Sequence, residues 1–196
     1  LYTERILDMP CMMTYQCPPY TPAVSPLPAE HTDRITFGVL NRLEKISDAC
    51  LRSWSFTMRA IDSKIIVKDR HLSDRNTRRT LLRRMIAMGI REDRIELRGV
   101  SNHLSQLQTF GEIDIQLDTY PQGGGISSAE ALVMGVPVLT LRGHVPASRT
   151  SATILTCIGH PEWIAENERE YVEKAIALAK DRAALAATRA KLREEM

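Results

Sequence analysis

The stretch that decides the fold is residues 117–132, LDTYPQGGGISSAEAL, a glycine-rich turn between an expected strand end and an expected helix start. Three consecutive glycines, Gly123 to Gly125, let the backbone approach a bound molecule closely. The backbone amides of residues 126–128 would then lie at a helix N-terminus, where the helix dipole favours an anion. The turn therefore predicts a site that a diphosphate would fit.

Short apolar runs alternate with longer amphipathic stretches on both sides of this turn, which is typical of βαβ units. The runs predict strands of a parallel sheet over residues 35–40, 64–68, 94–98, 113–118 and 137–141. Apolar residues at helical spacing predict crossover helices, the first beginning at Ser47 and Asp48 and the second ending at Gly89. The predicted fold class is α/β, a Rossmann-like parallel sheet with flanking helices.

Two terminal segments differ in amino-acid composition from this alternating region. Prolines are dense between Pro10 and Pro28, which predicts an extended arm or linker over residues 1–33. A single Rossmann-like, ligand-binding domain is expected over residues 34–160. Residues 161–196 are rich in Ala, Leu, Glu, Lys and Arg and predict C-terminal helices, broken near Asp181, that pack on the domain.

Composition excludes several classes of partner. The formal net charge of +2 is too small to indicate nucleic acid, and a solvated face is the favoured interpretation of the arginines at positions 75, 78, 79, 83 and 84. No apolar run approaches the ~18 residues that span a membrane, so we expect no membrane contact and a cytoplasmic location. The four cysteines form no C-x-x-C pair and the five histidines are scattered, so no metal site is expected.

Two side chains near the glycine-rich turn could act on a ligand. Glu130 lies about one helical turn beyond the glycines, where its carboxylate could accept hydrogen bonds from ribose hydroxyls. Lys45 follows the first strand and could neutralise the charge on a leaving diphosphate. The alternatives are that the glycines only make a tight turn that Glu130 caps, and that Lys45, like Arg42, is a solvated surface cation.

Residues after the third predicted strand are further candidates. Ser101 and Asn102 could cap a helix or present backbone groups to a base. His103 follows them, although a lone histidine is usually structural or solvated.

Several segments match one family in order and spacing. Asn41, Leu43, Lys45 and Ile46 look like the F-N-x-L-x-K-I element of that family. Other matching positions are Tyr2, Glu4, Met9 and Pro10 in a stretch that joins two lobes, residues 114–119, Gly124, Gly135 with Pro137, and residues 147–149 followed by 155–159. Together they resemble glycosyltransferase family 41, the O-GlcNAc transferase and SPINDLY group, over nearly the whole chain.

The resemblance implies a GT-B architecture, in which this chain is the C-terminal, donor-binding lobe, and a metal-independent inverting transfer. It implies that Lys45 is catalytic and contacts the donor diphosphate. The donor-binding positions that it implies are Asn41, Arg42, Ser101, His103, Gln106, Gly124, Gly125, Ile126, Ser127, Ser128, Glu130 and Arg149. Among them, Ile126 and Ser127 match phosphate contacts and Glu130 matches the ribose carboxylate.

Four positions depart from the pattern of the animal enzymes. Arg42 replaces a glutamine, His103 a lysine, Gln106 a histidine near the base, and Gly125 a histidine before the phosphate loop. Glycine at the last position is common in bacterial members, so the chain resembles the bacterial type. UDP-GlcNAc is the expected donor, and GDP-fucose or another nucleotide sugar stays open.

The function expected from the resemblance is transfer of a sugar such as GlcNAc from UDP-GlcNAc to Ser or Thr of proteins. The acceptor would bind through an N-terminal lobe and tetratricopeptide repeats that these residues do not include. We expect the fragment to bind donor without efficient turnover, because transfer needs both substrates held together. The alternatives are another GT-B enzyme, such as a nucleotide-sugar epimerase, and a degenerate nucleotide-sugar-binding or interaction module.

Overall fold

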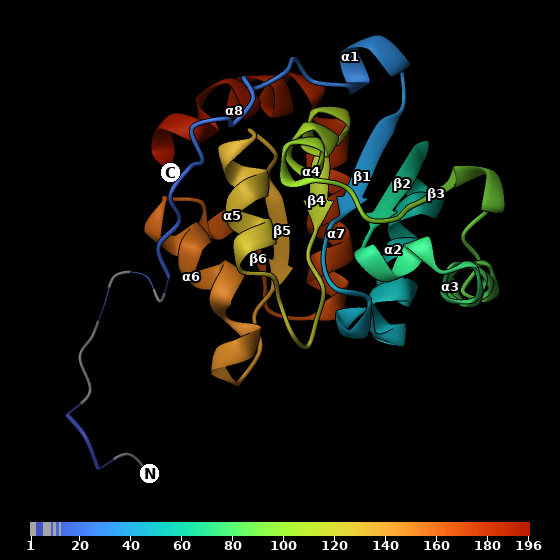
Figure 1. Cartoon of the computed structure of the whole chain (residues 1–196), viewed down its shortest axis with the longest axis horizontal. Coiled ribbons are helices and arrows are strands. Elements are labelled where there is room, and N and C mark those ends of the chain that lie inside the picture. The colour runs from blue at the N-terminus through green and yellow to red at the C-terminus, as the bar shows by residue number, and fades with distance from the viewer. Residues whose placement is uncertain (1–2, 6–8, 10, 12) are drawn as a thin grey trace.

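A parallel β-sheet forms the centre of the protein in a computed structural model, which describes residues 3–5, 9, 11 and 13–196. Within these residues the strands pair in parallel in the order β3-β2-β1-β4-β5-β6 (Figure 1). The strands are β1 (Ile35–Val39), β2 (Ser63–Lys68), β3 (Ile95–Arg98), β4 (Ile115–Leu117), β5 (Val138–Leu141) and β6 (Ile164–Ala165). The predicted α/β, Rossmann-like class is confirmed. β6 was not predicted, because two residues carry no recognisable apolar period.

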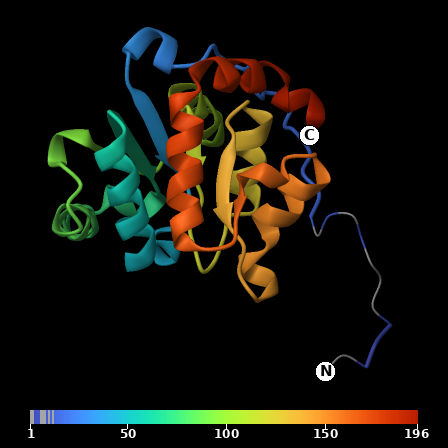
Figure 2. The same ribbon diagram turned by 180° about the vertical axis from the view of Figure 1, so that it is seen from behind.

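Helices cover both faces of the sheet (Figures 1 and 2). They are α1 (Ala29–Thr32), α2 (Asp48–Ala60), α3 (Arg75–Ala87), α4 (His103–Thr109), α5 (Ile126–Val133), α6 (Thr150–Cys157), α7 (Glu168–Lys180) and α8 (Arg182–Glu195). Apolar residues of α2, α3 and α7 share one core with the sheet, and those of α4, α5 and α6 share the other, while α8 contributes Leu185 to the first and Leu192 to the second. Neighbouring residues of β2 divide between these cores, since Ile65 belongs to the first and Ile66 to the second.

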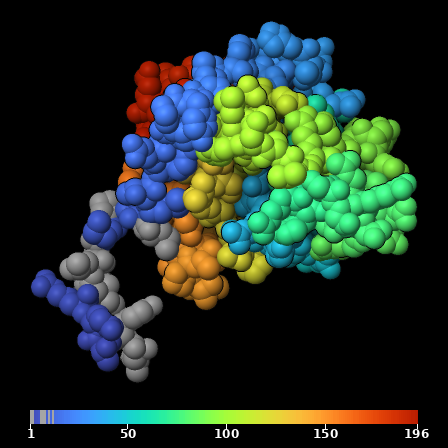
Figure 3. Space-filling view, viewed as in Figure 1, coloured from blue at the N-terminus to red at the C-terminus, as the bar shows by residue number. Residues whose placement is uncertain are grey.

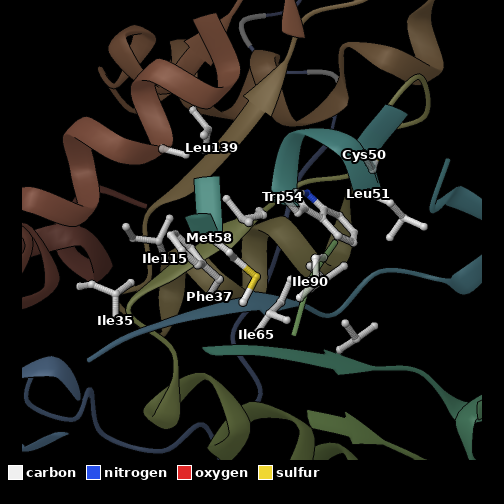
Figure 4. Close-up of a cluster of buried hydrophobic side chains, with 14 of the residues drawn as sticks. Ile35, Phe37, Cys50, Leu51, Trp54, Met58, Ile65, Ile90, Ile115 and Leu139 are labelled. Carbon is white, nitrogen blue, oxygen red and sulfur yellow. The ribbon is translucent and has the colours of Figure 1, made fainter. Parts of the chain in front are cut away.

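The larger core forms around Trp54 of α2, which is fully buried. Phe37, Ile65 and Ile115 reach it from adjacent strands, together with Met58 from the next turn of α2 (Figure 4). Burying several large apolar side chains stabilises the fold by roughly 1.5–3 kcal/mol for each one. This core holds α2 against the sheet, and the loop between β1 and α2 is held with it.

Local capping explains where the helices begin and end. Ser47 Oγ accepts a hydrogen bond from Cys50 N at 3.1 Å, so α2 begins where predicted. Asp181 Oδ1 accepts from Ala184 N at 2.9 Å, and this cap starts α8 at the predicted break. Gly89 follows α3 with φ of +91°, a conformation that favours glycine.

The second half of the proline-rich arm lies along α8. Arginine side chains of α8 donate to four arm carbonyls. Arg193 Nη2 donates to Pro22 O at 2.6 Å and Arg189 Nε to Ser25 O at 2.7 Å, while Arg182 donates to Asp33 O at 2.6 Å and to Ala29 O at 3.2 Å. Leu27 and Ala29 are buried in the larger core. This part of the arm therefore packs as part of the lobe. Of the positions matched to the interlobe stretch, Tyr2 and Pro10 lie outside the described residues.

In the part of the chain that the structure describes, no helix is both long and apolar enough to cross a membrane.

Candidate nucleotide-binding site

The carboxyl ends of β1 and β4 lie side by side in the sheet, at the point where the strand order reverses. Ligands of open α/β sheets bind in the crevice at such a point. The loop after β1 contains a short 3₁₀ helix, Leu43–Lys45, and the loop after β4 is the glycine turn, which we define as residues 118–126. The fold thus brings two of the predicted segments together.

Lys45 joins these two loops. Its Nζ donates a hydrogen bond to Gly123 O at 2.6 Å, and the side chain is half-buried. Burial lowers the pKa of Lys45 below its ordinary value of 10.5, with the carboxylate of Asp118 opposing that shift and Arg42 adding to it. Lys45 is therefore held against the glycine turn and is not a freely solvated lysine.

The glycine turn is shaped by Asp118, a fully buried residue that the sequence analysis did not single out. Its Oδ1 accepts from Gly124 N at 2.7 Å, Asn41 Nδ2 at 2.8 Å and Thr119 N at 2.9 Å. Its Oδ2 accepts from Thr140 Oγ1 at 2.8 Å. A carboxylate with four donors is well satisfied. The sequence feature that could have identified Asp118 is an acidic residue directly after the apolar run of β4.

The glycine turn leads into α5, whose first backbone amides have no hydrogen-bond acceptor among the described residues. The backbone amides of Ile126 and Ser127 have no acceptor among the described residues, as expected for the first residues of a helix that lacks a side-chain cap. Ser128 is different, because its amide already donates to Gly125 O at 3.1 Å and its Oγ pairs with Ser151 Oγ at 2.9 Å. Of the predicted loop contacts, Ile126 and Ser127 can bind an anion, whereas the Gly124 amide and the Ser128 hydroxyl already have partners.

Gly124 is packed so closely that no side chain would fit there. A Cβ at this position would overlap Ser128 Oγ and lie 3.1 Å from Asp118 Oδ1. Gly125 has ordinary free space, with Thr150 Cγ2 at 3.6 Å from such a Cβ. Gly124 is therefore required by packing, while position 125 can accept a side chain, consistent with the histidine that the resemblance places there.

A pocket of about 370 Å³ opens beside these loops. We call it the base pocket, and its lining is Leu40, Arg42, Lys68, Asp69, Arg70, Gly99, Val100, Ser101, His103 and Gln106. Four predicted donor-binding residues, from the loop after β1 and from the start of α4, thus meet in one cavity. Three other lining residues, Lys68, Asp69 and Arg70, were not predicted from the sequence. The feature that could have identified them is a run of charged residues at the end of a buried strand.

Glu130 is buried on α5 and is connected to the base pocket by His103. The Nε2 of His103 lies 2.8 Å from Glu130 Oε1, and the Glu130 side chain is 8% exposed. The sequence placed both residues in the site but gave no sign of this pair. A nearly buried carboxylate beside a pocket is suited to accept hydrogen bonds from ligand hydroxyls.

Arg149 does not reach the base pocket. Its Nε donates to Gly143 O at 2.8 Å, and its side chain lines a separate pocket of about 310 Å³ that includes Arg142 and Thr156. The remaining predicted residue, Asn41, is buried, and its Nδ2 donates hydrogen bonds to Asp118 Oδ1 and, at 3.1 Å, to Thr119 Oγ1. Its role in the structure is to hold the glycine turn.

The parallel sheet and this crevice define a class of protein. An α/β lobe with a lysine at a glycine turn, free amides at a helix start and a neighbouring pocket is the nucleotide-binding lobe of a GT-B glycosyltransferase. The sequence model described as Glycosyl transferase family 41 matches residues 26–196. The chain belongs to glycosyl transferase family 41.

The chain is also similar in sequence to individual proteins. The chain is 35% identical over 199 residues to the probable UDP-N-acetylglucosamine--peptide N-acetylglucosaminyltransferase SPINDLY of Eustoma exaltatum subsp. russellianum, covering 100% of this chain and 22% of that protein. The Arabidopsis thaliana protein of the same description is 33% identical over 197 residues, covering 98% and 21%. The chain therefore spans about a fifth of the length of these relatives.

A solved structure confirms the architecture. The O-GlcNAc transferase of Thermobaculum terrenum, solved as a mutant, superposes with a TM-score of 0.80 and 32% identity, over 90% of this chain and 34% of that one. The predicted family resemblance and the predicted GT-B lobe are both confirmed by these comparisons.

Proposed function

We propose that this chain is the donor-binding lobe of a protein O-glycosyltransferase that transfers GlcNAc from UDP-GlcNAc to Ser or Thr. The observation that carries the proposal is the position of Lys45, whose Nζ lies 2.6 Å from Gly123 O at the turn that leads to the free amides of Ile126 and Ser127. One cation and two amide donors therefore converge where a diphosphate would depart. Membership of family 41 and the activity for which its relatives are named support the choice of substrate class.

In the proposed reaction these groups act on the leaving diphosphate. Lys45 and the amides of Ile126 and Ser127 stabilise the negative charge that develops as the bond from the sugar to the diphosphate breaks. The acceptor hydroxyl attacks the anomeric carbon from the opposite face, which inverts its configuration. Because Lys45 and the helix start supply the positive charge, we propose a metal-independent transfer.

The rest of the donor would occupy the neighbouring pocket. The base would enter the pocket that Arg42, Ser101 and Gln106 line, and the ribose hydroxyls would donate to Glu130. In the parent protein we propose that an N-terminal lobe and tetratricopeptide repeats present the acceptor, and that the reaction takes place in the cytoplasm. Without that lobe, this chain would bind donor and lack efficient turnover.

The first test is calorimetric titration of the chain with UDP, GDP and UDP-GlcNAc. Lys45→Ala and Glu130→Ala should each weaken binding by about tenfold or more, since a hydrogen bond to a charged group contributes roughly 1.5–3 kcal/mol. Lys180→Ala, which removes an exposed lysine at the end of α7, is the matched control and should bind as the unaltered chain does. A folded chain that binds none of the three ligands would refute the proposal.

One observation favours a second candidate, a nucleotide-sugar-binding module without transferase activity. Arg42, His103 and Gln106, which depart from the animal pattern, all line the base pocket. A pocket rebuilt in this way can retain binding while losing the geometry for transfer. Donor binding by the full-length parent, with neither transfer nor hydrolysis, would favour this candidate over the enzyme.

A further inference from the structure

The proline-rich arm makes a side-chain hydrogen bond to the candidate site. Tyr20 Oη lies 2.8 Å from Nδ1 of His103, and the two rings meet edge to face with centroids 5.7 Å apart. The other nitrogen of His103 lies 2.8 Å from Glu130 Oε1. A continuous chain of hydrogen bonds therefore runs from the arm, through the start of α4, to the carboxylate on α5.

The chemistry of the three groups sets the direction of these bonds. An ionised carboxylate only accepts, so Nε2 of His103 donates its proton to Glu130. In the neutral imidazole Nδ1 is then an acceptor, and the hydroxyl of Tyr20 donates to it. Tyr20 thereby stabilises the one tautomer of His103 that can hold Glu130.

The arm is held firmly where Tyr20 lies. Tyr20 lies inside a turn, in which Thr21 N and Thr21 Oγ1 donate to Pro18 O at 2.9 Å and 2.6 Å. Two residues further on, Arg193 of α8 binds Pro22 O at 2.6 Å. In Figure 3 the blue arm lies against the yellow-green surface that includes α4. Tyr20 is half exposed, yet its hydroxyl is directed at the imidazole by this fixed backbone.

Glu130 keeps one oxygen available. Its Oε1 faces His103, whereas Oε2 makes no hydrogen bond with any residue that the structure describes. A second arm tyrosine lies near this carboxylate: Tyr15 has a buried hydroxyl with no hydrogen-bond partner among the described residues. Burial, and next the charge of Glu130, raises the pKa of Tyr15 to about 12. The surroundings of Glu130 are thus formed partly by the arm.

We propose that Tyr20 is a positioning residue of the donor site, which acts through His103 to orient the Glu130 carboxylate toward the ribose hydroxyls of the nucleotide. The inference rests on the proposed function and adds to it that the arm helps to set the affinity for ribose. Tyr20 is distinct from the donor-binding set, because it does not itself line the base pocket and reaches it only through its hydroxyl contact with His103, which does.

The test is calorimetric titration of the full chain and its Tyr20→Phe variant with UDP, with GDP, and with the 2′,3′-dideoxy form of each. The substitution keeps the ring contact and removes only the hydroxyl. We expect about three- to tenfold weaker binding of the ribose nucleotide that the unaltered chain prefers, because one hydrogen bond is lost. Binding of its dideoxy form should be the same in both chains, since no ribose hydroxyl is there to meet Glu130.

Two further variants separate this role from general damage to the arm. Thr32→Val removes a hydroxyl from another part of the arm, where it bonds only to the backbone carbonyls of Pro28 and Arg34, and should leave both affinities unchanged. His103→Ala should cause a ribose-specific loss, and adding Tyr20→Phe to it should cause no further loss, since the two residues act in series.

Three results would overturn the inference while leaving donor binding intact. They are wild-type affinity in Tyr20→Phe, an equal loss for the ribose and dideoxy forms, and additive losses in the double variant. A folded unaltered chain that binds no nucleoside diphosphate would instead refute the proposed function, and the inference with it.

Discussion

The glycine turn and two arginines of the neighbouring base pocket, Arg42 and Arg70, are held in opposite ways. In the turn, four donors converge on the buried carboxylate of Asp118, and Lys45 is already bound to a backbone carbonyl. In the pocket, Arg42 and Arg70 are exposed, and their side chains make no hydrogen bond or ion pair with the described residues. The turn is organised before any ligand arrives, whereas these pocket arginines are free to adjust.

This contrast coincides with where the chain departs from the animal pattern. Three of the four departures, Arg42, His103 and Gln106, line the base pocket, and the fourth is Gly125, where a side chain can be accommodated. Gly124 and Asp118, which hold each other in place, match the family. The glycine turn that Lys45 contacts is fixed by the buried contacts of Asp118, whereas Arg42 and position 125 can vary without disturbing those contacts.

The largest effect is expected for Asp118→Ala, which removes the acceptor on which the turn depends. Because buried donors lose their partner, the free energy of unfolding should fall by on the order of 3 kcal/mol or more. Urea denaturation measures it, with Asp93→Ala, an exposed carboxylate paired with Arg91, as a control that changes stability by less than about 0.5 kcal/mol. If Asp118→Ala unfolded at the same urea midpoint as the unaltered chain, the glycine turn would not depend on Asp118 and would not differ from the pocket in this way.

An intermediate effect is expected from the pH dependence of Lys45. Burial holds its pKa below 10.5, and the ammonium form attracts the diphosphate, so affinity is complete below the lowered pKa and falls by about tenfold as pH rises through it. The effect on folding has the opposite sign. Between the lowered pKa and 10.5 the unfolded chain binds more protons, so the contribution of Lys45 to stability rises with pH.

Calorimetric titrations at a series of pH values measure this alkaline decline. Lys45→Arg is the matched control, because a guanidinium stays charged throughout and its affinity should not decline in the same range. An identical decline in both chains would show that another group titrates.

The smallest effect is expected for Arg42→Gln, which restores the residue that the animal pattern has at this position. Removing one exposed cation should weaken nucleoside diphosphate binding about two- to fivefold at low salt, and the loss should shrink as salt is added. Stability should stay within about 0.5 kcal/mol. Arg79→Gln, an exposed arginine of α3, is the control and should change neither quantity. A large loss of stability in Arg42→Gln would mean that the pocket is as structural as the turn.

Much of the fold could be predicted because its signals are local. The strands before β6, the cap at Ser47 and the break at Asp181 each depend on residues that are neighbours in the sequence. The glycine turn could be recognised in the same way. The candidate site was predicted less completely, since Asp118 and Tyr20 were missed and Arg149 faces another pocket.

The sequence by itself determined the parallel α/β lobe, the family and the residue types around a diphosphate. Only the tertiary structure decided which of these residues have partners. Asn41 meets Asp118 across 77 positions of the chain, and Tyr20 meets His103 across 83. A hydrogen bond depends on distances of a few tenths of an ångström between groups that packing brings together, and no local period or motif encodes such distances.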